Sequence, residues 1–218
     1  MARGGEPTEL YLILQVAGSP AGLEGIAAAA NATGRVATIL LEPDATTPPT
    51  PSDLATLVAA IQKLGLATLV SGDASLARIV NADGVHLPPS KTIMASYTEA
   101  RETLGSRFIV GIDAGRSRHD AMSLGETGAD YIGFGIPPHV EDRDTARERS
   151  ADLIAWWSEI FEVPCIAFDV ETPEEAEDLV RAGADYIALR LPAGLATADV
   201  PHHLAPFTAV LDLEAAVS

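Results

Sequence analysis

The stretch NADGVHL, at residues 81–87, recurs as GADYIGFG at residues 128–135 and as GADYIALR at residues 183–190. Each copy follows a helix-like stretch, turns at a corner that ends in aspartate, and continues into an apolar run. Internal repeats of this kind are the first guide to the architecture of a chain. Because the copies lie about two strand–helix units apart, they mark every second strand of a parallel array, as in a (β/α)8 barrel.

Eight short apolar runs rich in Val, Ile and Leu agree with this architecture, because parallel strands covered by helices have that composition. Between them, the apolar stripe of residues 52–64 and the Thr-Pro-Glu-Glu start of residues 172–182 predict helices. The proline-rich segment 43–52 predicts an irregular loop. The sequence therefore predicts an α/β fold, a small (β/α)8 TIM barrel formed as a single domain over residues 1–218. The expected strands cover residues 10–16, 36–42, 67–71, 84–87, 108–113, 131–135, 164–170 and 186–191.

The aspartates of the repeated phrase, Asp83, Asp130 and Asp185, directly precede strands. We therefore expect them at the N-terminal face of the barrel, where recurring residues stabilise the fold. Catalytic residues are expected at the opposite face, at the carboxyl ends of the strands.

The composition limits the kinds of partner that the chain is expected to bind. The formal net charge of −17 argues against nucleic acid and anionic membranes, and no run approaches the ~20 apolar residues of a membrane span. The acids Glu6 and Glu9 argue against a signal peptide. The single cysteine, Cys165, is expected to be a small buried hydrophobe, so disulfides have no role and the expected compartment is the cytoplasm.

Three stretches carry a family resemblance: LARIVNADGVHL at residues 76–87, GADYIGFG at residues 128–135, and VPCIAF at residues 163–168 followed by TPEEA. They resemble thiamine-phosphate synthases and the related thiazole tautomerases, with gaps, from about Leu10 to Leu191. The resemblance implies a (β/α)8 barrel that joins a hydroxymethylpyrimidine diphosphate to a thiazole phosphate with Mg²⁺ and releases pyrophosphate.

The residues that the resemblance assigns to metal and diphosphate binding are replaced in this chain. Gly72 and Lys91 stand where the family has its two metal carboxylates, and Glu42 and Asp44 stand where it has diphosphate-binding cations. Because Mg²⁺ requires hard oxygen ligands in near-octahedral geometry, we expect the family's Mg²⁺ site to be lost, with no metal ligands and no cofactor.

The phosphate-binding and proton-transfer positions differ as well. Asp113 replaces the family's serine on the fifth strand, and Gly115 replaces the histidine of the tautomerases. The glycine pair that receives the thiazole phosphate becomes Asp169 and Val170, which place a like charge near a phosphate. Arg143 keeps a cation where the family has a lysine. We therefore expect that the seventh and eighth strands do not hold a phosphate.

Several polar residues are predicted to meet at the barrel mouth. The carboxylates of Glu42, Asp113 and Asp169 could bind a metal, hold a cationic substrate or support acid–base chemistry. Alternatively, they are solvated residues of the rim or helix caps. His86 has the alternative of a satisfied histidine in the barrel interior, and His139 lies in a loop that could close as a lid. The candidate catalytic residues are Asp113, Asp169 and His139, and the candidate substrate-binding residues are Glu42, His86, Lys91, Arg143 and Arg190.

Two functional hypotheses remain open. The chain is either a transferase or isomerase of the thiamine-phosphate synthase type with a rebuilt site, or a non-catalytic barrel, a pseudoenzyme, that binds a small ligand or a partner protein. In both cases we expect a small-molecule ligand at the barrel mouth. The sequence leaves a monomer and a homodimer equally open.

Overall fold

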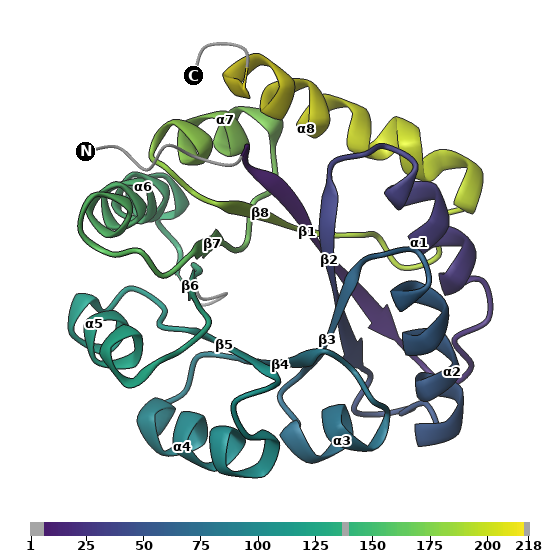
Figure 1. Cartoon of the computed structure of the whole chain (residues 1–218). Helices are drawn as coiled ribbons and strands as arrows, with labels where there is room; N and C mark the ends of the chain where they lie inside the picture. Colours follow the sequence, from purple (N-terminus) through teal and green to yellow (C-terminus); the bar gives the residue numbers. More distant parts are fainter. Residues whose placement is uncertain (1–6, 137–139, 216–218) are drawn as a thin grey trace.

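A computed structural model describes residues 7–136 and 140–215 of the chain. Eight parallel strands pair in sequence order and close into a barrel, with the helices surrounding it (Figure 1). The predicted (β/α)8 barrel is therefore confirmed. The strands are β1 (Glu9–Val16), β2 (Val36–Pro43), β3 (Ala67–Ser71), β4 (Gly84–Leu87), β5 (Ile109–Asp113), β6 (Tyr131–Phe134), β7 (Cys165–Ala167) and β8 (Tyr186–Arg190).

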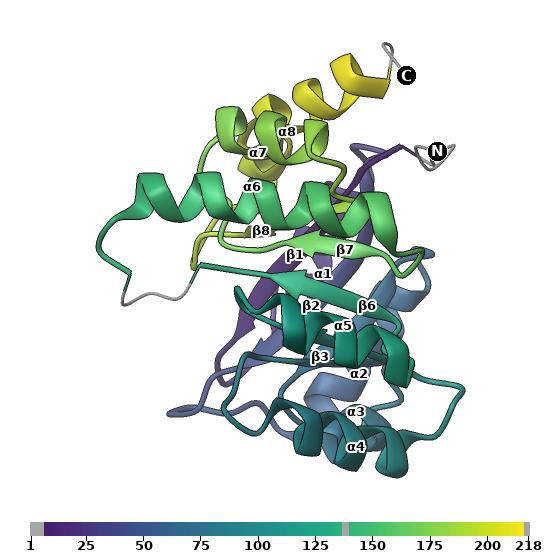
Figure 2. The same cartoon turned by 90° about the vertical axis from the view of Figure 1, so that its left-hand side faces the viewer.

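The helices lie along the outside of the barrel, as the side view shows (Figure 2). They are α1 (Leu23–Asn31), α2 (Pro51–Gln62), α3 (Ala74–Ile79), α4 (Ile93–Leu104), α5 (Arg118–Thr127), α6 (Arg143–Ile160), α7 (Pro173–Arg181) and α8 (Val200–Ala215), with a short 3₁₀ turn at Thr197–Asp199. None of the helices in the described part of the chain is long and apolar enough to cross a membrane.

Most of the predicted strand ends agree with the structure to within one residue, and two segments differ by more. The loop expected over residues 43–52 is shorter, because Pro43 ends β2 and α2 begins at Pro51, where proline fits the first helical turn and Thr50 caps it. The strand expected over residues 164–170 is limited to Cys165–Ala167. Asp169 adopts a left-handed conformation, with φ 59°, which turns the backbone out of the strand.

The three repeated aspartates lie at the N-terminal ends of the strands, as predicted. Each carboxylate accepts a hydrogen bond from a backbone N–H of the preceding strand, and the aspartate N–H donates back to the carbonyl of the same residue. The pairs are Asp83 with Thr68 (2.7 and 2.8 Å), Asp130 with Val110 (2.7 and 3.1 Å) and Asp185 with Cys165 (2.7 and 3.1 Å). The repeat is thus a clamp between neighbouring strands, distant from the barrel mouth.

The apolar core has two parts. The larger one lies between the strands and the helices, and it includes Cys165, which is fully buried as expected. The smaller one fills the barrel interior. Its buried members are Tyr11, Ile13, Leu40, Leu69, Tyr131, Ile166, Phe168 and Ala188. This inner layer closes the barrel below the mouth and forms the base on which the polar residues of the mouth stand.

Candidate active site

The carboxyl ends of the strands surround a cavity of about 620 Å³ at the barrel mouth. Six of the eight residues that the sequence proposes for the site line this cavity: Glu42, His86, Asp113, Arg143, Asp169 and Arg190. The sequence had placed Glu42, Asp113 and Asp169 at the carboxyl ends of strands, and closure of the barrel brings all six residues together.

Asp113, the last residue of β5, is the most deeply buried acid of the mouth, with 5% of its surface exposed. Its Oδ1 accepts a hydrogen bond of 2.6 Å from the N–H of Gly115. Burial raises the pKa of Asp113 to about 6, and the charge of Asp169 acts in the same direction, while the N–H groups of Gly115 and Gly135 oppose the rise. The carboxyl group can therefore exchange a proton near neutral pH.

Asp169 faces the same cavity from the turn after β7. Its Oδ2 accepts a hydrogen bond of 2.9 Å from the N–H of Ile136. Partial loss of solvent raises the pKa of this carboxyl, although the Ile136 N–H and the charges of Arg143 and Arg190 lower it. The left-handed backbone at Asp169 directs the side chain toward the loop after β6.

Gly135 separates the two carboxylates. A Cβ atom at this position would lie 2.8 Å from Oδ2 of Asp113 and 2.8 Å from Oδ2 of Asp169. The two oxygens are therefore no more than twice that distance apart, and only glycine leaves them room. Within residues 7–136 and 140–215, no salt bridge joins either carboxylate to a cation.

The two arginines of the mouth are held by other acids. Arg190 donates to both carboxylate oxygens of Glu42, at 2.5 and 3.1 Å. Arg143 donates to the carbonyl of Ile136 at 3.4 Å and to Glu171 at 3.2 Å. Both guanidinium groups are thus engaged by partners on the rim, and Glu171 is a mouth residue that the sequence reading missed.

His86 points into the barrel interior rather than to the rim. Its Nδ1 lies 2.9 Å from the hydroxyl of Tyr131, which lies 3.0 Å from the hydroxyl of Tyr11. The imidazole stacks on Phe168, with ring centroids 4.7 Å apart. Burial lowers the pKa of His86 to about 3, so the ring is neutral.

The sequence contained a signal for some inward-facing residues that the sequence analysis did not propose for the site. Along GADYIGFG, alternation places Tyr131, Gly133 and Gly135 on one face of the strand, and that face is the inward one. Attention to the two glycines would have indicated a close approach by other side chains. At Gly133 that side chain is Phe168, at 2.8 Å from the position of a Cβ atom.

The structure places one of the proposed residues away from the cavity and does not describe another. Lys91 is exposed on the turn before α4 and does not line the cavity. His139 lies outside the residues that the structure describes.

The positions that correspond to the family's metal ligands do not fit Mg²⁺. Gly72 offers no side chain, and the neighbouring Asp73 uses its carboxylate to cap α3, where it accepts a hydrogen bond of 2.8 Å from Leu76. In the described part of the chain, no group of three His, Cys, Asp or Glu side chains is arranged to hold a metal ion.

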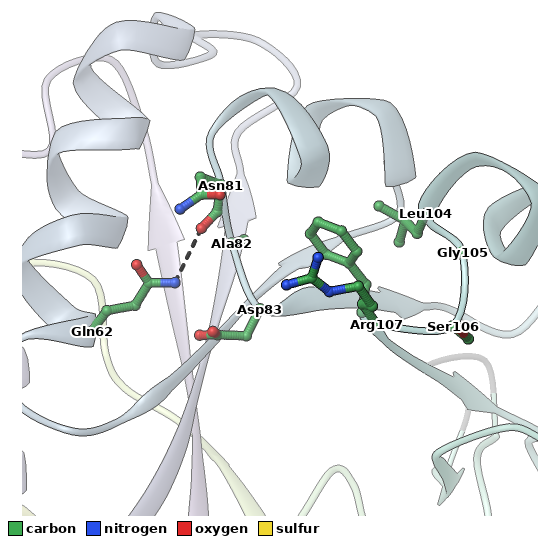
Figure 3. Close-up of a pocket in the computed structure, with 9 residues that line it drawn as sticks. Gln62, Asn81, Ala82, Asp83, Leu104, Gly105, Ser106 and Arg107 are labelled. Carbon is green, nitrogen blue, oxygen red and sulfur yellow. Dashed lines mark hydrogen bonds between the residues drawn. The ribbon is translucent and has the colours of Figure 1, made fainter.

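A second cavity, of about 530 Å³, lies at the opposite, N-terminal face (Figure 3). On one side of it Gln62 donates a hydrogen bond of 3.1 Å to the carbonyl of Asn81, and Arg107 lies on the other side (Figure 3). Its acid, Asp83, already accepts a strand N–H. Because catalysis in TIM barrels takes place at the carboxyl ends of the strands, the mouth is the candidate active site.

The closed barrel and the polar cavity at the carboxyl ends of its strands define a (β/α)8-barrel protein with its site at the mouth. Residues 10–191 match the family described as thiamine monophosphate synthase. The chain belongs to this family, as the sequence resemblance indicated.

Individual relatives agree with this assignment. The chain is 35% identical to a thiamine-phosphate synthase of Rhodospirillum centenum over 181 residues, which is 83% of this chain and 86% of that protein. It is 40% identical to a thiamine-phosphate synthase of Erythrobacter litoralis over 126 residues, 57% of this chain and 58% of that protein. The solved thiamine phosphate pyrophosphorylase from Pyrococcus furiosus has the same fold, with a TM-score of 0.69 and 21% identity over 94% of this chain and 95% of that one.

Proposed function

We propose that this chain is a divergent barrel of the thiamine monophosphate synthase family that binds a small cationic or hydrogen-bond-donating molecule at its mouth. In this proposal it does not carry out the family's Mg²⁺-dependent transfer. The observation that carries the proposal is the pair of carboxylates, Asp113 and Asp169, that face each other across Gly135 without a salt-bridge partner among the described residues. Such a pair attracts a cation or a donor group and repels a phosphate.

A comparison of interaction energies supports the exclusion of phosphate from the mouth. Two like unit charges ~4 Å apart cost about 4 kcal/mol at an effective dielectric constant near 20. One good hydrogen bond to a charged group returns only about 1.5–3 kcal/mol. Arg190 and Arg143 offer little compensation, because Glu42 and Glu171 already engage them.

Two probes of matched shape and opposite charge test the binding proposal. Calorimetric titration at pH 8 should show that benzamidinium binds more tightly than benzoate, and that Asp113→Asn and Asp169→Asn each weaken benzamidinium binding. Equal or tighter binding of benzoate would contradict the proposal, as would binding that both variants leave unchanged.

The loss of the family reaction has its own test. Titration with Mg²⁺ plus pyrophosphate should give no measurable heat, and incubation with hydroxymethylpyrimidine diphosphate and thiazole phosphate should yield no thiamine phosphate. The double variant Asp169→Gly with Val170→Gly should bind pyrophosphate better than the unmodified chain. A micromolar dissociation constant for pyrophosphate, or Mg²⁺-dependent product from the unmodified chain, would overturn this part.

A second candidate function is a proton-shift isomerisation of the bound molecule. The observation that favours it is the pKa of Asp113, about 6, because a general acid–base group works best when its pKa lies near the operating pH. Incubation of thiazole phosphate in D₂O, followed by mass spectrometry, would detect exchange of carbon-bound hydrogen. Exchange that Asp113→Asn abolishes would favour this candidate over binding alone.

A further inference from the structure

Three buried polar groups form a continuous hydrogen-bonded chain inside the barrel. Tyr11 is 1% exposed, Tyr131 is 6% exposed and His86 is 5% exposed. The Tyr11 and Tyr131 hydroxyls are 3.0 Å apart, and the Tyr131 hydroxyl is 2.9 Å from His86 Nδ1. His86 is also part of the cavity wall, so this chain begins in the apolar interior and ends at the mouth.

The hydrogens of this chain can be arranged in two directions. In the first, Tyr11 donates to Tyr131, and Tyr131 donates to Nδ1 of His86. In the second, Nδ1 carries the hydrogen and donates to Tyr131, and Tyr131 donates to Tyr11. All three groups are neutral in both directions, since burial raises the pKa of both tyrosines and lowers that of His86.

The two directions differ in whether every buried hydroxyl hydrogen has an acceptor. The second direction leaves the hydroxyl hydrogen of Tyr11 without an acceptor, because Tyr131 is its only hydrogen-bond partner among the described residues. Around Tyr11 lie apolar side chains of the inner core, with the ring of Phe168 at 5.6 Å. A buried donor without an acceptor destabilises the folded state, so the first direction is favoured.

We propose that Tyr131, whose hydroxyl accepts a hydrogen bond from Tyr11, is a positioning residue that fixes His86 as the Nε2–H tautomer, so that this histidine offers a hydrogen-bond donor, and no acceptor, to a molecule in the mouth. Nδ1 faces Tyr131, and Nε2 is the ring nitrogen left for the cavity. The mouth then combines a neutral donor at His86 with carboxylate acceptors at Asp113 and Asp169. It selects molecules that carry an uncharged acceptor, such as a carbonyl oxygen or a ring nitrogen, together with a cationic or donor group.

This inference rests on the proposed function only for the role of the mouth as a ligand site, because the tautomer is a property of the free protein. Long-range proton–nitrogen NMR of protein labelled with ¹⁵N-histidine reports it directly. The signals of His86 are identified by their absence in His86→Gln. We expect a protonated Nε2 and an unprotonated Nδ1 whose resonance is displaced by a hydrogen bond. A protonated Nδ1, or an even mixture of tautomers, would overturn the inference.

Three tyrosine variants then test the assigned direction. Tyr131→Phe removes the donor, so the Nδ1 resonance should move to the value of an unbonded ring nitrogen. Tyr11→Phe should leave Nδ1 bonded, because the hydrogen of Tyr131 still needs His86. The control is Tyr97→Phe, a tyrosine on α4 that is 2% exposed and lies outside the barrel, and it should leave both resonances unchanged. An Nδ1 resonance unaffected by Tyr131→Phe would contradict the assigned direction.

The failures of the two ideas can be told apart. If benzamidinium does not bind while His86 is the Nε2–H tautomer, the proposed ligand class is wrong and the positioning role stands. If benzamidinium binds and His86 carries its hydrogen on Nδ1, the positioning role is wrong and the ligand class stands.

Discussion

At the scale of single residues, the chemistry of the mouth depends on where each carboxylate finds a partner. Glu42 and Glu171 pair with arginines on the rim, whereas among the described residues Asp113 accepts hydrogen bonds only from backbone N–H groups. A buried carboxylate without a cation beside it has a raised pKa. Because this pKa differs between the folded and unfolded chain, the stability of the fold depends on pH.

We expect Asp113→Asn to stabilise the fold at neutral pH. The pKa of Asp113 is about 6 in the folded chain and 3.8 as its ordinary value, so the folded state holds more protons between these pH values. The stability that the protonated acid contributes is complete below pH 3.8 and is lost as the pH rises through about 6. At pH 7 the variant should gain about 1–3 kcal/mol in the free energy of unfolding.

Urea unfolding at pH 7 and at pH 4 measures this gain, which should shrink toward the lower pH. The control is Asp44→Asn. Hydrogen bonds from Thr47 and Thr46 lower the pKa of Asp44, so its substitution should destabilise the chain at pH 7. A less stable Asp113→Asn protein at pH 7 would contradict the assigned environment.

Gly135→Ala should abolish benzamidinium binding. Its methyl group would meet both carboxylate oxygens at 2.8 Å, so the two acids must move apart. The control is Gly25→Ala on α1, where the new methyl group meets only the side chain of Thr197, at 3.3 Å. Titration calorimetry with both variants checks this, and benzamidinium affinity retained in Gly135→Ala would show that the carboxylates do not form the site.

At the scale of secondary-structure elements, the sequence predicted which strand ends carry the polar residues but not how those residues meet. Glu42 and Asp113 are the penultimate residue of β2 and the last residue of β5, as the apolar runs implied. The turn of Asp169 depends on a left-handed backbone, and hydropathy does not encode φ. Likewise, the corner aspartates were assigned to the correct face, but their bonds to the preceding strand depend on tertiary packing.

An arginine of α4 supports the corner at Asp130. Arg101 donates to the carbonyls of Gly105, Phe108 and Gly128, at 3.1, 2.8 and 3.2 Å, and to the carboxylate of Asp130 at 2.6 Å. Arg101→Met removes all four of these hydrogen bonds, and each lost bond contributes on the order of 1 kcal/mol. We expect the free energy of unfolding to fall by about 1–3 kcal/mol.

Arg78→Met is the matched control for this substitution. Arg78 is exposed, and its guanidinium makes one hydrogen bond, of 3.3 Å, to the carbonyl of Thr103. Chemical unfolding of the two variants should show a clearly larger loss for Arg101→Met. Equal losses would mean that the α4 arginine is not the support of this corner.

At the scale of the whole molecule, the repeated phrase was sufficient to predict the barrel, because it marks alternate strands of a closed array. The site was predictable only in part. Closure brought six of the eight proposed residues to one cavity, whereas Lys91 lies outside it because its turn remains exposed on the surface. Predicting that Tyr11 and Tyr131 meet inside the barrel would have required the register of all eight strands.

The net charge of −17 implies a salt-dependent stability. Repulsion among excess acids destabilises the compact state, and salt screens that repulsion. We expect the midpoint of thermal unfolding to rise between 20 mM and 300 mM sodium chloride, as measured by circular dichroism. A midpoint that falls with salt would indicate that specific ion pairs such as Arg190 with Glu42 outweigh the general repulsion.

The facing carboxyl groups of Asp113 and Asp169 also have a calorimetric consequence. At a pH equal to the pKa of Asp113, about 6, roughly half of the molecules hold a proton there. A cation that enters the mouth favours the ionised form, so its binding expels part of this proton into the surrounding buffer. The observed heat of benzamidinium binding should therefore vary with the ionisation enthalpy of the buffer near pH 6. It should lose that dependence near pH 8, where the carboxyl has already released its proton.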